Sequence, residues 1–215
     1  SSFEYGEIPS DMMEEADKWR LNLFEEVATY DETLMEKYLD DEEILPDEMK
    51  VAIRKATLDS SMIPTVCGSA FKNKGVQRTL DAVVDFLPSP LDVGDLEGMD
   101  CDDESIKLSR SPNDSDPFSA IAFKIMTDPY VGRLTFFRVY SGTISTGDFI
   151  YNPNSGKKER VGRLMLMHSN KREERNKVTT GEIAAVVGLK NTQTGHTLCS
   201  VDETILLESM DFPDP

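Results

Sequence analysis

Apolar residues near the start of the chain repeat at the spacing of an α-helix. They form a stripe with a 4-3-4-4 spacing that consists of Met12, Ala16, Trp19, Leu23 and Val27. The pattern predicts an amphipathic helix with this stripe buried and with Trp19 as its anchor. Asp11 is suited to cap the start of the helix, and Glu14, three residues later, completes a capping box.

Three further helices are predicted in the first half of the chain. One covers residues 33–39. The next begins at Pro46, a residue that suits the first position of a helix because the N–H it lacks would be unpaired there. Its buried side is expected to consist of Met49, Ala52, Ile53 and Ala56. The last begins at Val76, repeats apolar residues at helical spacing and ends at Pro88.

Residues 62–67 form a short β-rich run just before this last helix. Pro64 lacks an N–H and cannot join a ladder on both sides, so the strand is expected at the edge of a sheet. Strand, loop and helix in this order make half of a βαβ unit, and the neighbouring strands must come from elsewhere. Residues 1–88 are therefore predicted to be mostly helical and to carry the end of an α/β domain.

From Phe118 onward the apolar pattern changes to a period of two, which is typical of β-strands. The residues expected to share a face are Ser119, Ile121, Phe123 and Ile125, and then Thr135, Phe137 and Val139. Glycine-containing turns follow at short intervals, so residues 118–215 are predicted to form a small antiparallel β-barrel. Residues 89–117 are rich in proline and aspartate, which indicates a linker with an extended strand near Ile106.

The net charge of −17 is spread unevenly along the chain. Residues 1–88 carry −11, residues 89–117 carry −7 and residues 118–215 carry +1. The two halves are therefore expected to meet partners of different charge. No apolar run approaches membrane-spanning length, and three cysteines without a CxxC pair indicate free thiols in a reducing cytoplasm. We expect a cytoplasmic monomer with no membrane partner, no metal-binding site and no catalytic residue of its own.

Five blocks of the sequence, in a fixed order, carry a resemblance to one known family. They are residues 67–77, 118–125, 128–142, 165–174 and 207–213. The third block begins with Asp128-Pro129-Tyr130-Val131-Gly132-Arg133. Together the blocks resemble bacterial elongation factor G, a translational GTPase, in which the first block is the fifth guanine-nucleotide motif and the next two open domain II.

The resemblance implies an α+β fold of several parts, as in an internal piece of that factor. Residues 1 to about 60 would be a subdomain inserted in the P-loop GTPase domain, residues 61–88 the last strand and helix of that domain, and residues 118–215 the domain II barrel. The parent would hydrolyse GTP, bound with Mg²⁺, to move tRNA and mRNA through the ribosome. No Gly-rich phosphate cradle occurs in this sequence, so the chain alone is expected to bind neither GTP nor GDP and not to act as an enzyme.

The same resemblance implies a guanine-base loop at Ser69, Ala70 and Phe71. The Ala70 N–H would donate to the guanine O6, and the Ser69 hydroxyl would hold the base or brace the loop. The alternative interpretation is an ordinary helix start with Ser69 as its cap.

Two charged surfaces are candidate ribosome contacts. Residues 157–177 hold eight Lys and Arg against three Glu, and the resemblance implies contact with small-subunit ribosomal RNA. The candidates for this contact are Lys157, Lys158, Arg160 and Lys171. The acidic first helix would dock the basic domain of the ribosomal stalk protein, with Glu14, Asp17 and Glu25 as candidates. In both cases the alternative is a plain solvated surface.

Other functions stay open at this stage. Within the same class, the alternatives are a ribosomal-protection protein and release factor three. The run from Asp128 to Arg133 favours elongation factor G over both. A stand-alone, non-catalytic adaptor that binds RNA or protein is the alternative from a different class. The missing nucleotide cradle agrees with an adaptor, whereas the half-built βαβ unit argues against one.

Overall fold

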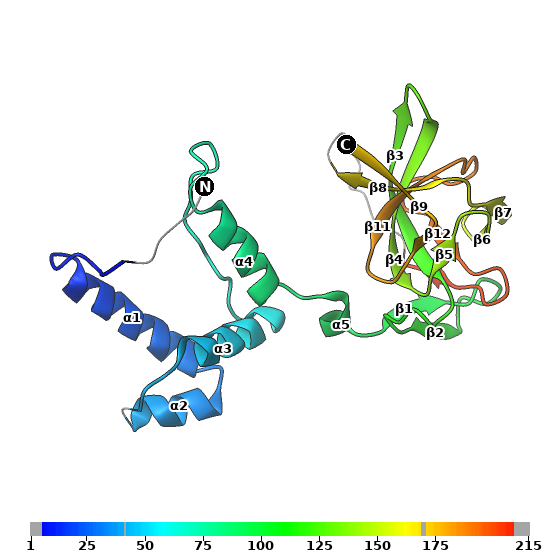
Figure 1. The fold of residues 1–215 in the computed structure, drawn as a ribbon. Helices are drawn as coiled ribbons and strands as arrows, with labels where there is room; N and C mark the ends of the chain where they lie inside the picture. Colours follow the sequence, from blue (N-terminus) through cyan, green and yellow to red (C-terminus); the bar gives the residue numbers. More distant parts are fainter. Residues whose placement is uncertain (1–5, 41, 169–170, 209–215) are drawn as a thin grey trace, which may run out of the picture. The chain divides into compact units, whose positions relative to one another are not determined.

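The computed structural model describes residues 6–40, 42–168 and 171–208, and the chain divides into two compact units, Ser1–Asp92 and Val93–Pro215 (Figure 1). Part of the last resembling block, residues 209–213, lies outside the described residues. The described part of the first unit is helical, and that of the second consists mainly of antiparallel strands. None of the described helices has the length and apolar character needed to cross a membrane.

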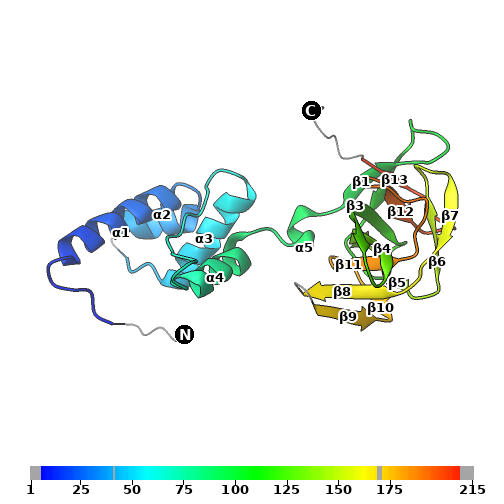
Figure 2. The ribbon, with the colours of Figure 1, turned by 90° about the horizontal axis from the view of Figure 1, so that it is seen from above.

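Four helices lie where the sequence predicts them, and a short fifth helix, α5, lies in the predicted linker (Figure 2). Their bounds are α1 Met13–Ala28, α2 Glu32–Leu39, α3 Pro46–Leu58, α4 Val76–Phe86 and α5 Pro90–Val93. Asp31 caps α2 by accepting the Leu34 N–H at 3.1 Å. Pro46 opens α3 as expected, and the Glu48 carboxylate accepts the Leu45 N–H at 2.9 Å.

The core of this unit lies where the C-terminal end of α1 meets α2 and α3. It contains Val27, Ala28, Leu34, Ile44, Met49 and Ala52. The expected anchor is wrong, because Trp19 is 61% exposed and the rest of the α1 stripe, up to Leu23, is also largely uncovered. The capping box at Asp11 is wrong too, since Met12 occupies the N-cap and no side chain caps the helix.

Residues 62–67 do not form the predicted edge strand. They have no regular secondary structure and lead to an isolated bridge between Ser69 and Lys74. A strand needs a partner for its ladder, and no described segment pairs with these residues. Together with α4 they line an open, largely apolar groove of about 430 Å³. No residue of α4 is buried, although its apolar residues lie at helical spacing.

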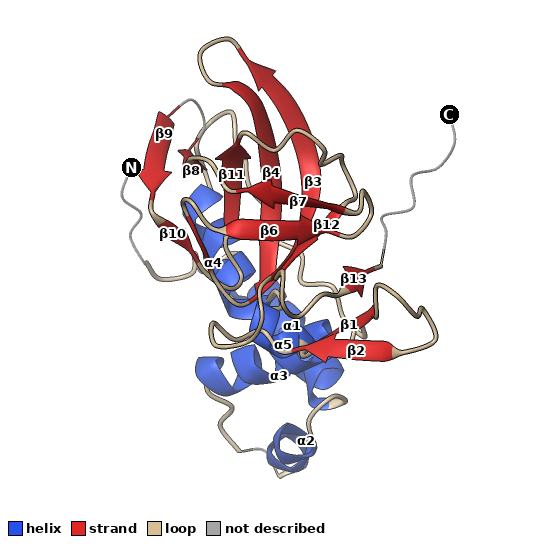
Figure 3. Cartoon of the chain, turned by 90° about the vertical axis from the view of Figure 1, so that its right-hand side faces the viewer, coloured by secondary structure: helices blue, strands red, loops and turns tan. Residues whose placement is uncertain are grey.

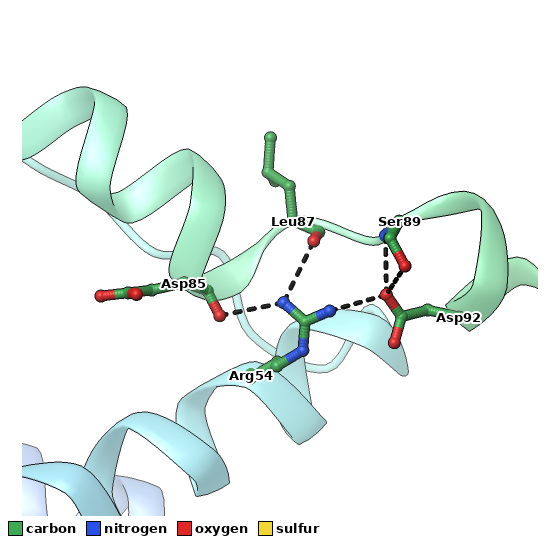
Figure 4. A network of polar contacts seen from close by, with 5 residues as sticks. All are labelled: Arg54, Asp85, Leu87, Ser89 and Asp92. Atoms are coloured by element: carbon green, nitrogen blue, oxygen red, sulfur yellow. Dashed lines mark hydrogen bonds and ion pairs between the residues drawn. The ribbon is translucent and has the colours of Figure 1, made fainter. Parts of the chain in front are cut away.

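Arg54 of α3 ties the end of α4 to the segment that leaves the first unit (Figure 4). One guanidinium nitrogen donates to the carbonyl oxygens of Asp85 at 3.0 Å and Leu87 at 3.2 Å. The other lies 2.6 Å from the Asp92 carboxylate, which also accepts from the Ser89 hydroxyl and N–H. The bonds from Ser89, together with Arg54, lower the pKa of Asp92.

The second unit is built from thirteen strands among the described residues (Figure 3). They are β1 Leu96–Met99, β2 Lys107–Arg110, β3 Ser119–Asp128, β4 Gly132–Ser141, β5 Ile144–Ser145, β6 Phe149–Asn152, β7 Lys157–Arg160, β8 Leu164–His168, β9 Lys171–Arg175, β10 Lys177–Val178, β11 Ile183–Val187, β12 Thr197–Cys199 and β13 Leu206–Leu207. The main sheet has the order β7-β6-β12-β3-β4-β11-β8-β9, with every pair antiparallel.

This sheet curls around one core, because side chains from strands far apart in its order pack together. Ile150 of β6, Phe137 of β4 and Leu164 of β8 belong to the same buried cluster. The predicted antiparallel β-architecture is confirmed. Thr135, Phe137 and Val139, which were expected to share a face of their strand, are all buried.

On β3, the face expected to carry Ile121 is not the one that lines the main core. Ala120 and Ala122 are fully buried in the main core, whereas Ile121 packs on a second cluster with Ile205 and Leu207. A register shift between Ala122 and Lys124 also breaks the alternation. A small sheet of order β13-β1-β2 contributes to this second cluster, so residues 89–117 contain two paired strands. The extended strand expected near Ile106 is β2, which begins at Lys107, while Ile106 itself lies in the bend before it.

Candidate functional site

The Ser69 loop is a tight turn that follows residues 62–67. The Ser69 N–H donates to the Lys74 carbonyl at 2.9 Å, and the Ser69 carbonyl accepts from Lys72 and Lys74. Glycine is required on both sides of the turn. A Cβ at Gly68 would lie 2.9 Å from the Lys74 oxygen, and Gly75, at a φ of +75°, closely approaches the Cys67 carbonyl.

The three residues predicted to touch a guanine base lie on the outside of this turn. Phe71 is fully exposed, Ala70 is exposed and Ser69 is half-buried. The Ala70 N–H donates to no group of the described chain, so it is available to an acceptor such as the guanine O6. The loop therefore fits one wall of a base pocket, and its role in binding stays a prediction.

Phosphate and Mg²⁺ would need other groups. The described residues contain no cluster of His, Cys, Asp and Glu that could hold a metal ion. Asp95-Leu96-Glu97-Gly98 has the spacing of a GTPase switch motif, but Leu96–Met99 is β1 and Gly98 packs against Ile205.

Strand β7 presents three of the four predicted RNA contacts at one edge of the main sheet. Lys157, Lys158 and Arg160 are all exposed. The Lys157 Nζ donates to Asn191 at 3.0 Å, the Lys158 Nζ lies 4.8 Å from the centre of the Phe149 ring, and the Arg160 Nε donates to the Gly147 carbonyl at 3.3 Å. These contacts restrain the three side chains in the structure.

Glu159, between these cations, points the other way and holds the loop between β11 and β12. Its carboxylate accepts the N–H groups of Lys190 at 2.6 Å and Asn191 at 3.0 Å, and the Thr192 hydroxyl at 2.8 Å. Burial alone would raise its pKa, but these hydrogen bonds outweigh burial and lower it. Arg133 donates to the carbonyls of Lys190 and Thr192 from the other side of the loop.

Lys171 is not brought together with the β7 cations. It opens β9, which is the opposite end strand of the main sheet in the strand order. The acidic candidates on α1 are all exposed, and Glu25 accepts the Tyr38 hydroxyl at 2.7 Å. No structural observation tests the stalk-protein contact of Glu14, Asp17 and Glu25, which stays a prediction.

The sequence analysis missed two features of the second unit. The first is the structural role of Glu159, which a single acid among alternating cations in a strand could have suggested. The second is a contact between the β3–β4 turn and β9. There, Arg172 pairs with Asp128 at 2.5 Å and its guanidinium carbon lies 5.7 Å from the centre of the Tyr130 ring. No pattern within either strand indicates this contact, because its partners are 42 or more residues apart.

Comparison with known proteins assigns part of the second unit. Residues 117–201 match the family model of elongation factor G domain 2. The fold is similar to that of a solved Thermus thermophilus protein designated ttk003000868, with a TM-score of 0.70 at 23% identity. The match covers 93% of this chain and 27% of the Thermus chain, so this chain spans about a quarter of that protein's length.

Proposed function

We propose that this chain is part of a translation elongation factor of the elongation factor G type, and that its second unit contacts small-subunit ribosomal RNA. The match of residues 117–201 to elongation factor G domain 2 carries the proposal. Strand β7 supports it, because three exposed cations on an edge strand form a surface suited to phosphate oxygens. The larger protein would use GTP hydrolysis to move tRNA and mRNA through the ribosome.

The RNA contact can be tested with the labelled chain and purified small ribosomal subunits. We expect binding that weakens steeply with salt, because each phosphate contact releases counterions. Reversing Lys157, Lys158 and Arg160 to Glu should reduce affinity by about tenfold or more and flatten the salt dependence.

A matched control keeps the change in net charge the same. Lys18, Arg78 and Lys107 are exposed and lie outside β7, so their reversal to Glu should leave affinity close to that of the wild type. Equal losses from both triple variants would show that net charge alone governs binding and would contradict a site on β7.

In the larger protein the first unit would supply the guanine-base loop and a helix, α4, that packs on the GTPase sheet. The exposed apolar face of α4 and the unpaired residues 62–67 support this arrangement. This chain alone should give no heat of GTP binding in a calorimetric titration at micromolar concentrations, because it holds no phosphate cradle. Micromolar affinity would contradict the proposal that this chain supplies the guanine-base loop while the phosphate-binding part of the pocket lies elsewhere in the larger protein.

A further inference from the structure

The turn between β3 and β4 holds an aromatic ring out in solvent. Tyr130 is 87% exposed, and its side chain contributes nothing to the buried clusters of the unit. Large aromatic side chains are usually covered, since burying them is favourable. An aromatic ring that is exposed and also held in place is therefore expected to bind a partner outside the described chain.

Two hydrogen bonds fix the backbone of the turn, and one side chain lies against the ring. The Asp128 carboxylate accepts the N–H groups of Tyr130 at 2.8 Å and Val131 at 3.1 Å, which fixes the turn. Arg172 reaches across from β9, pairs with the other oxygen of Asp128 and lies against the Tyr130 ring. The backbone bonds from Tyr130 and Val131, helped by Arg172, lower the pKa of Asp128, so the carboxylate stays charged near neutral pH.

We propose that Tyr130 is a stacking platform for an unpaired base of RNA. The Arg172 guanidinium, which is paired with Asp128, lies against the Tyr130 ring and supplies a cation beside the proposed stacking site. Lys171, next to it at the start of β9, is exposed and adds a second cation. Stacking requires a free base face, which unpaired nucleotides offer and duplex nucleotides do not.

The charges of β9 favour RNA over a protein surface as the occupant. Its two acids are Glu173 and Glu174, and Glu173 is already engaged by Arg175 at 3.0 Å. A protein partner for Tyr130 would need an apolar patch around the ring, whereas the contact that the ring makes in the structure is with the Arg172 guanidinium. This proposal rests on the RNA contact proposed above and adds a second site at another edge of the sheet.

The test uses the full chain and an oligouridine of about 12 nucleotides with one central 2-aminopurine, whose fluorescence falls when it stacks. We expect wild-type binding to quench the probe. Tyr130→Ala should lower affinity by about tenfold and remove the quenching, whereas Tyr130→Phe should retain both. Pairing the oligonucleotide with its complement should abolish the dependence on Tyr130. Trp19→Ala, which removes the exposed indole of the first unit, is the control and should bind as the wild type.

The outcomes separate this proposal from the function on which it rests. Unchanged affinity and quenching in Tyr130→Ala would overturn the stacking platform, while weaker binding in the β7 triple variant would leave the general RNA contact standing. Wild-type binding without quenching would also overturn stacking. If the wild-type chain binds neither the oligonucleotide nor ribosomal subunits, both proposals are wrong. Circular dichroism of Tyr130→Ala should match the wild type, because the side chain is not part of a core.

Discussion

The two units of this chain differ in how they use their apolar residues. In the second unit, strands from across the main sheet cover a common core, and Phe137, Val139 and Leu198 are almost completely buried. In the first unit only one end of α1 is covered, and α4 buries none of its residues. Both units have clear amphipathic patterns. The pattern therefore indicates which residues would gain from burial, but not whether a neighbouring segment buries them.

The largest expected effect is the loss of a core ring from the second unit. Phe137→Ala removes a side chain that is 2% exposed, and we expect the free energy of unfolding to fall by about 3–5 kcal/mol. Urea unfolding followed by circular dichroism measures this. Phe149→Ala, at a ring that is 53% exposed, is the matched control and should cost about 1 kcal/mol or less. Equal costs would show that the core of this unit is not the cluster described.

The next effect concerns Glu159, the buried carboxylate behind the exposed cations of β7. Glu159→Ala leaves the donors of Lys190, Asn191 and Thr192 without their acceptor, and we expect a loss of about 2–3 kcal/mol. Glu104→Ala, at an exposed acid in a turn, should be close to neutral in the same measurement. A neutral Glu159→Ala variant would mean that water replaces the carboxylate.

Glu159 also predicts a pH dependence. Its pKa in the folded state lies below the ordinary value of 4.5, so the unfolded state binds the proton more tightly. The stabilisation is therefore present above pH 4.5 and is lost as the pH falls through the folded-state pKa. The Glu159→Gln variant should be less stable at neutral pH and should lose less stability on acidification. Parallel curves for the two proteins would contradict the assignment.

A smaller and local effect is expected where the chain leaves the first unit. Arg54→Met should speed amide hydrogen exchange at Leu87 and Ser89 several-fold, because the carbonyls at the end of α4 and the Asp92 carboxylate lose their shared donor. Lys55→Met is the matched control, since this neighbouring cation lies 3.9 Å from Asp31 and should not affect these amides. Unchanged exchange in Arg54→Met would show that Ser89 and Asp92 hold the turn without it.

The smallest effect is expected on the exposed face of α4. Leu80 and Val84 are 61% and 78% exposed, so their replacement by Lys should change the unfolding free energy of this chain by no more than about 0.5 kcal/mol. The double variant should also bind less of a dye that fluoresces on apolar surface. Ala52→Lys, at a buried site of α3, should instead destabilise strongly. A large cost at Leu80 and Val84 would mean that this face is already covered.

Much of the fold follows from local pattern. Pro46 begins α3 and Pro88 follows the end of α4 because proline restricts the backbone wherever it occurs. The failures at Trp19, at residues 62–67 and on β3 share one cause. At Trp19 the helix formed as predicted, whereas residues 62–67 form no strand and a register shift breaks the alternation on β3. In each case the position of a distant segment, or the lack of one among the described residues, decided the outcome.

The features of the candidate sites also fall into two groups, those that the local sequence indicates and those that depend on distant segments. Gly68 and Gly75 mark the Ser69 loop in the sequence, since a tight turn demands them locally, and the cations of β7 stand within four consecutive residues. The separation of Lys171 from β7, the inward turn of Glu159 and the approach of Arg172 to Tyr130 depend on strand order and register.

The sequence by itself therefore determined the first four helices, the antiparallel strands after residue 117 and the turn at Ser69, because these depend on backbone preferences within a few residues. Only the tertiary structure decided which faces are covered and which charges meet, because those outcomes depend on segments that are far apart in the chain and adjacent only after folding.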